Sequence, residues 1–195
     1  DTTSPDDTFK YGLDARYGIT SNTTLDLTTK TDFAQIESDK EIINLTRFDV
    51  SYPEKRDFFL EGSENFDFTQ GPIKLFYSRR IGLSEDRSLL PILGGAKLTH
   101  TGGGYRLGAM SVQTGEEDGY PSTNYSVMRL RKDVLEQSYV GVIATSLAEQ
   151  TGHDNQAYGI DGAYRTDRFL GDKNLHIQSY LTGTVTDGEA EDSMA

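Results

Sequence analysis

The segment FKYGLDARYGI, residues 9 to 19, decides the fold class because its side chains alternate with a period of two. One parity carries Phe9, Tyr11, Leu13, Ala15, Tyr17 and Ile19. The other carries Lys10, Gly12, Asp14, Arg16 and Gly18. Successive side chains of a strand point to opposite faces, so the pattern predicts a strand with one apolar and one polar face. Its length matches the roughly 9 to 11 residues of a tilted membrane strand.

The alternation continues outward from this strand in a series of hairpins. Ser21-Asn22 is a tight turn, and residues 23 to 35 place leucines opposite Asp26 and Lys30 as the return strand. Further strands are expected at 43–52, 74–83, 92–101, 104–114, 123–135, 138–149, 156–167 and 173–186. Glycine-rich turns between them favour consecutive hairpins over βαβ units. The sequence therefore predicts an all-β antiparallel meander of long hairpins.

Two segments depart from this rhythm. Residues 1–8, DTTSPDDT, are short, polar and acidic, and read as a linker before a single domain over 9–195. Residues 53–72 are rich in Phe, charged and punctuated by Gly. We expect them to form an ordered loop that turns its rings inward and packs on the wall of strands.

Composition narrows the class of protein. The chain has 195 residues, and its 35% hydrophobic content is low for a large dry core. The net charge of -12 argues against nucleic acid, which needs clustered Lys and Arg. The absence of Cys excludes disulfides, thiolate nucleophiles and Cys-ligated zinc. No apolar run approaches the roughly 20 residues of a membrane helix, and no signal peptide is evident, so any export signal would lie upstream of Asp1.

A sheet with one apolar and one polar face can line a pore or belong to a soluble sandwich. Strand length favours the pore, because sandwich strands average about five or six residues whereas these run near ten. The sequence thus predicts part of a transmembrane β-barrel, with a soluble β-sandwich as the alternative.

A family resemblance adds to this reading. The segments that show the resemblance are TLDLTTKTDFAQIESDKEIINLTRFDVSYPEKRDFFLEG at 24–62 and LFYSRRIGL at 75–83. They are followed, in order, by GGAKLTHTGGGYRLGAMSVQTGEEDG, NYSVMRLRKD, SYVGVIATS and AYGIDGAYR. The chain resembles an uncharacterised outer-membrane barrel-like domain that follows a carbohydrate-binding family-nine-like module in bacterial envelope proteins. The resemblance implies an outer-membrane location and a barrel architecture, and implies little about activity.

Candidate structural residues cluster in and after the irregular segment. Glu54, Lys55 and Arg56 follow Pro53, and Arg79 with Arg80 lies on the next expected strand. Ion pairs among them would staple the loop to the wall. The aromatic cluster Phe58, Phe59, Phe66 and Phe68 is expected to fill the lumen, with sugar stacking as the alternative use.

Catalytic and metal-ligating patterns are weak. The acidic set Asp32, Glu37, Asp39 and Glu41 lacks the glycine-centred loop of a calcium motif and suits a solvated hairpin end. Glu61 with Glu64 or Asp67 could form the carboxylate pair of a glycoside hydrolase, an unfavoured reading in so acidic a chain. His100, His153 and His176 lie on different hairpins without ligand spacing. We expect no catalytic residue, metal or cofactor.

The leading functional hypothesis is a non-enzymatic segment of a bacterial outer-membrane β-barrel with a transport, pore or surface-scaffold role. Its expected partners are outer-membrane lipid and either a glycan or another envelope protein, and not nucleic acid. The alternatives are a soluble carbohydrate-binding β-domain and a glycoside hydrolase.

Overall fold

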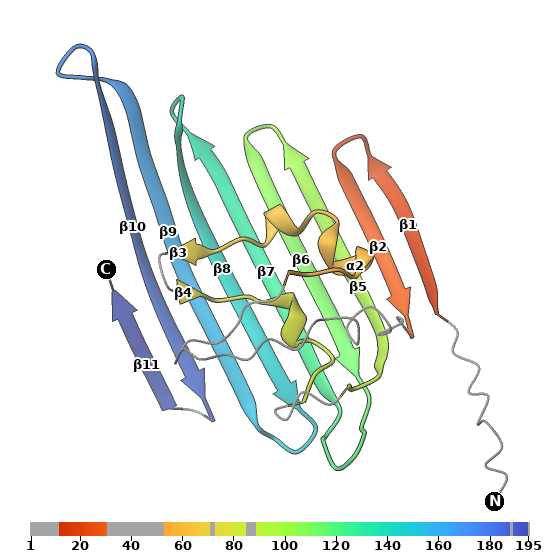
Figure 1. Cartoon of the computed structure of the whole chain (residues 1–195). Coiled ribbons are helices and arrows are strands. Elements are labelled where there is room, and N and C mark those ends of the chain that lie inside the picture. The colour runs from red at the N-terminus through yellow and green to blue at the C-terminus, as the bar shows by residue number, and fades with distance from the viewer. Residues whose placement is uncertain (1–11, 31–52, 71–72, 85–88, 188, 195) are drawn as a thin grey trace, which may run out of the picture.

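The computed structural model describes residues 12–30, 53–70, 73–84, 89–187 and 189–194. Within them, nine strands form one antiparallel sheet in the order β1-β2-β5-β6-β7-β8-β9-β10-β11, as Figure 1 shows. Every strand therefore pairs with its neighbours along the chain, and the predicted all-β meander is confirmed. In this part of the chain the sheet does not close into a barrel, because β1 and β11 lie at its two edges.

The strand bounds follow the alternating segments of the sequence. They are β1 Leu13–Thr20, β2 Thr23–Thr29, β5 Ile92–Gly102, β6 Tyr105–Thr114, β7 Thr123–Val134, β8 Ser138–Glu149, β9 Asp154–Phe169, β10 Lys173–Thr186 and β11 Glu189–Met194. Strand β11 was not expected from the sequence. The start of the first expected strand, the expected strand at 43–52 and the linker at 1–8 lie outside the described residues.

The expected strand at 74–83 is wrong. This stretch contains only the two-residue strand β4, Ile73–Lys74, and a 3₁₀ turn, η2, at Ser78–Arg80. The backbone N–H groups of Arg80 and Ile81 donate to the carbonyls of Tyr77 and Ser78. Local turn bonds satisfy this backbone because the segment packs on a sheet face and reaches no edge of the large sheet.

Residues 53–84, apart from 71–72, form what we call the inner segment. It contains α2 at Asp57–Leu60, η1 at Ser63–Asn65, the short pair β3 at Thr69–Gln70 with β4, and η2. Figure 1 shows the inner segment lying across one face of the large sheet. We call that side of the sheet the inner face and the opposite side the outer face.

The outer face exposes many large apolar side chains, whereas the inner face buries charged and hydroxyl side chains together with apolar ones. Charged and hydroxyl side chains of the inner face are buried under the inner segment, namely Asp26, Thr28, Lys97, Arg129, Asp161 and Thr182. Large apolar side chains of the outer face are exposed, among them Leu13, Tyr17, Leu27, Met128, Val142, Ile160 and Ile177. The hydrophobic core lies between the inner segment and the inner face, where Phe58, Phe66 and Phe68 contact strand residues such as Val112 and Ile143.

Among the described residues, no helix has the length and apolar character needed to cross a membrane.

Candidate functional site

Three aromatic rings of the inner segment lie over three glycines of the inner face. The pairs are Phe58 over Gly95 on β5, Phe66 over Gly108 on β6 and Phe68 over Gly159 on β9. A Cβ atom at Gly108 would lie 2.7 Å from Cε1 of Phe66, closer than real Cβ atoms come to other heavy atoms. A Cβ atom at Gly159 would likewise lie 2.7 Å from Cζ of Phe68. The missing side chains are therefore what lets the rings reach the sheet.

Lys97 fastens the start of the inner segment to β5. Its Nζ donates to the carbonyl oxygens of Phe58 at 2.5 Å and Glu61 at 2.7 Å, and lies 3.3 Å from Asp26 Oδ2. The side chain is 1% exposed. These acceptors, one carbonyl within α2 and one at its C-cap, replace the water that the ammonium group loses on burial.

Further polar contacts, from β1 and β5, extend this attachment. Arg16 on β1 pairs with Asp26 on β2 at 2.6 Å and also contacts the carboxylate of Glu61. Thr101 on β5 donates to Asn65 Oδ1 in η1 at 3.0 Å. The inner segment is thus held by polar bonds from β1 and β5, with Asp26 of β2 pairing with both Arg16 and Lys97, in addition to its buried rings.

A second buried ion pair spans the inner face farther along the sheet. Arg129 on β7 donates to both carboxylate oxygens of Asp161 on β9, at 2.6 and 2.9 Å. Strand β8 lies between them, and its Gly141 makes the crossing possible because a Cβ atom there would lie 2.8 Å from both groups. Arg129 also lies over the ring of Phe68, 5.1 Å from its centroid. This bridge ties three strands together beneath the inner segment.

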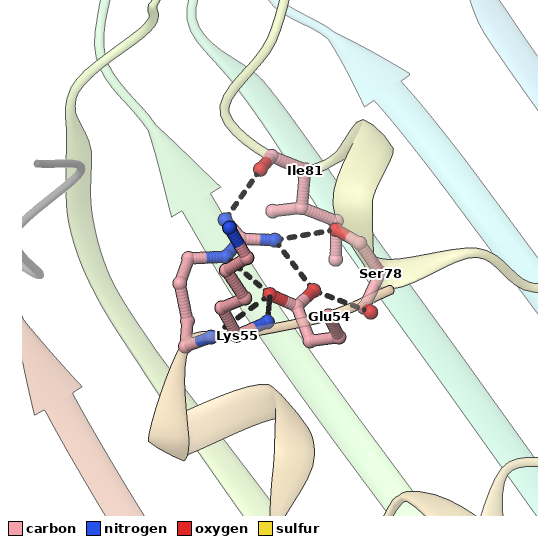
Figure 2. A network of polar contacts seen from close by, with 5 residues as sticks. Glu54, Lys55, Ser78 and Ile81 are labelled. Carbon is pink, nitrogen blue, oxygen red and sulfur yellow. Dashed lines mark hydrogen bonds and ion pairs between the residues drawn. The ribbon is translucent and has the colours of Figure 1, made fainter. Parts of the chain in front are cut away.

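A network of polar contacts, called here the polar network, connects the two ends of the inner segment, as Figure 2 shows. Arg56 donates to both carboxylate oxygens of Glu54 at 2.9 Å and to the carbonyl oxygens of Ser78 and Ile81 at 2.8 Å. Glu54 also accepts from the Ser78 hydroxyl at 2.6 Å and from the backbone N–H of Lys55 at 3.0 Å. The polar network joins residues 54–56 at the beginning of the inner segment to residues 78–81 at its end.

The polar network also sets the charge state of Glu54. Burial raises the pKa of the Glu54 carboxyl, but the hydrogen bonds and charge of Arg56, with the Ser78 hydrogen bond, outweigh it and hold the pKa below its ordinary value of 4.5. Glu54 therefore stays ionised at neutral pH, as an acceptor for four donor groups.

The residues expected to staple the loop to the wall are partly brought together. Glu54 and Arg56 pair with each other inside the inner segment, and Arg56 lies 4.0 Å from the centroid of the Phe59 ring. Arg79 is buried and Arg80 is exposed, both in η2 and not on a strand. The four phenylalanines Phe58, Phe59, Phe66 and Phe68 are all buried in one cluster.

Sequence reasoning missed the residues by which the sheet holds the inner segment, namely Asp26, Lys97, Arg129 and Asp161. The available signal was a charge at an inward-facing strand position whose cross-strand neighbours are apolar or glycine, as Arg129 lies between Gly108 and Ile143. Such a charge requires a partner from outside its own row.

The other candidates do not form a site in the described residues. Asp32, Glu37, Asp39 and Glu41 lie outside them. Glu61 contacts Arg16, and Glu64 is exposed. His100 hydrogen-bonds Thr23 at 2.8 Å, His153 pairs with Asp187 at 2.8 Å, and His176 lies on β10, so the histidines do not converge. Within this part of the chain, no group of three acidic or histidine side chains is placed to bind a metal.

Comparison with known protein families gives a match over the N-terminal part of the chain. Residues 2–91 match the model of a family described as a domain of unknown function (DUF5916). No curated protein and no solved structure matches the chain. Over its N-terminal part the chain is therefore similar to an unknown-function domain. The barrel architecture and the neighbouring carbohydrate-binding module implied by the resemblance stay predictions.

Proposed function

We propose that this chain is a wall segment of a bacterial outer-membrane β-barrel, with its outer face against lipid and its inner segment inside the lumen. The observation that carries the proposal is that the sheet exposes large apolar side chains on its outer face and buries charged side chains on its inner face. The exposed fractions are 56% for Ile160, 54% for Met128 and 67% for Leu13, while Lys97 and Asp161 are almost fully buried.

The free energy of burial supports a lipid setting for the outer face. Full burial of a large apolar side chain contributes about 1.5–3 kcal/mol. More than ten such side chains of the outer face are at least 40% exposed in this sheet. In water, the burial free energy that these side chains do not gain would be comparable to the whole stability of a domain, about 5–15 kcal/mol. Contact with hydrocarbon would supply it.

The outer face is also banded. One row of cross-strand neighbours is apolar or aromatic from β1 to β9: Tyr17, Leu25, Leu98, Ala109, Met128, Ala144 and Tyr158. The row two residues away is polar on β6 to β9: Ser111, Ser126, Ser146 and Gln156. Ser111, Asn124 and Ser126 hydrogen-bond to one another there. A membrane-spanning strand requires this change where it leaves the hydrocarbon.

At the opposite end of the apolar band lie an aromatic ring and a cation in contact with each other. Lys132 Nζ lies 3.6 Å from the centroid of the Tyr105 ring, next to the turn between β5 and β6. Aromatic rings and flexible cations gather at membrane–water interfaces, where one end of the side chain is apolar and the other is hydrated.

The edges of the sheet complete the proposal. Unpaired N–H and C=O groups are too costly in hydrocarbon, so β1 and β11 need partner strands in the membrane. Those strands would come from the rest of a longer protein or from another copy. The wall has a transport, pore or surface-scaffold role, without an enzymatic step.

Cell fractionation tests the proposal. The protein that contains this chain should sediment with the outer membrane, resist extraction by high salt, and migrate faster on a gel when unheated than after boiling. Recovery as a soluble periplasmic protein, with mobility independent of heating, would refute it.

A further inference from the structure

Two arginines of the inner face lie side by side next to the inner segment. Arg106 on β6 and Arg131 on β7 are direct cross-strand partners. They share this face with Arg129 and Met110, because side chains two residues apart on a strand point the same way. Thr101, the partner of Arg106 on β5, hydrogen-bonds Asn65 of η1, which places the arginine pair at the edge of the inner segment.

Like charges directly opposite on a sheet destabilise it, so this pair requires a reason. In the described residues, Arg131 has one ion pair, with Asp133 Oδ1 at 3.5 Å from its Nε, and Arg106 has none. Asp161, in the same cross-strand row two strands from Arg131, gives both oxygens to Arg129. Within the part of the chain that the structure describes, the two positive charges are therefore poorly neutralised.

One of the two guanidinium groups is also held in position. Arg131 lies over the ring of Tyr139 on β8, with 3.7 Å between Cζ and the ring centroid. Its Nε is buried and, apart from the 3.5 Å contact with Asp133 Oδ1, has no hydrogen-bond partner among the described residues. An arginine fixed on an aromatic ring keeps its remaining N–H groups oriented for bidentate bonding to a carboxylate or a phosphate.

We propose that Arg106 and Arg131 bind an anionic group of a solute, a carboxylate or a phosphate, between their guanidinium groups at the inner face. The anion supplies the neutralisation that the two strands lack. The lumenal setting of this site rests on the proposed function, whereas the binding itself requires only the sheet.

The test is anion binding by the protein that contains this chain, purified in detergent and measured by calorimetry at constant ionic strength. The probes are inorganic phosphate and glucuronate, with glucose as the uncharged control. We expect at least one anion to bind with a millimolar or lower Kd and glucose not to bind. Which anion binds distinguishes a phosphate-bearing from a carboxylate-bearing solute.

Two matched variants assign the binding. Arg106→Gln should weaken it about tenfold, since a charge-assisted bond is lost. Arg168→Gln removes the same charge from a side chain that is 75% exposed near the β9–β10 turn, and should change binding less than twofold. The thermal midpoint gives a second readout: the anion should raise it for the wild type and not for Arg106→Gln.

The inference is overturned if neither anion binds, or if the two variants weaken binding equally. These outcomes leave the membrane location untouched, because fractionation and heat-dependent mobility do not depend on the arginine pair.

Discussion

Replacement of Gly108 by alanine places a methyl group where the ring of Phe66 lies. The new Cβ would be 2.7 Å from Cε1 and 2.9 Å from Cδ1 and Cζ of that ring. Phe66 is 3% exposed and cannot swing into open space, so the ring or the β6 backbone has to move. Overpacking of this kind costs about 1–3 kcal/mol. The upper limit is the loss of the whole ring contact, about 3–5 kcal/mol.

The assay is urea unfolding in detergent of the protein that contains this chain, followed by far-ultraviolet circular dichroism. The matched control is Gly18→Ala in β1, where the nearest atom to the new Cβ would be the Thr20 carbonyl oxygen at 4.0 Å. That substitution should be neutral or stabilise by about 0.5–1 kcal/mol, as expected for an unstrained strand glycine. Gly108→Ala should lower the free energy of unfolding by about 1–3 kcal/mol.

A double-mutant cycle isolates the ring contact. With Phe66 already replaced by alanine, the added methyl at Gly108 has room, so most of its cost should disappear. Two results would refute the reasoning. Either Gly108→Ala is as stable as Gly18→Ala, or its cost is unchanged in the Phe66→Ala background.

Three further predictions follow from the buried charges and the outer face. Asp161→Ala leaves Arg129 buried without its carboxylate and should cost about 3–5 kcal/mol in urea unfolding; a cost under about 1 kcal/mol would contradict it. Because the folded pKa of Glu54 lies below 4.5, the wild type should lose stability as the pH falls below that value. Glu54→Gln should lack this part of the pH dependence of the thermal midpoint. An unchanged profile would show that ionised Glu54 does not stabilise the polar network. Met128→Lys should destabilise the protein in bilayers by about 2–4 kcal/mol, and an equal midpoint would place this position outside the hydrocarbon.

The sequence predicted most of the sheet because each strand carries its own evidence. In β1 and β9 the alternation and the flanking turn residues are local, and they specify both the strand and the parity of its faces. The same parity identified which side chains of β1 are apolar, and those are exposed on the outer face.

The attachment of the inner segment could not be predicted in the same way. Gly108 and Gly159 read as ordinary weak points of a strand, since their role depends on rings about 40 and 90 residues away in the chain. The stretch at 74–83 looked like a strand because Leu75, Phe76 and Ile81 are apolar, whereas tertiary packing on a sheet face selects turns there.

The most direct test of the central claim compares the two faces of one strand in a lipid bilayer. Ile177 and Gln178 are consecutive, exposed residues of β10 on opposite faces, and the chain has no cysteine, so single cysteines can carry a nitroxide label at either position. A label at 177 should collide with oxygen and be shielded from a water-soluble nickel chelate, and a label at 178 should show the reverse. Equal accessibility of both labels to the nickel chelate would mean that water covers both faces, and the outer face would then not contact lipid.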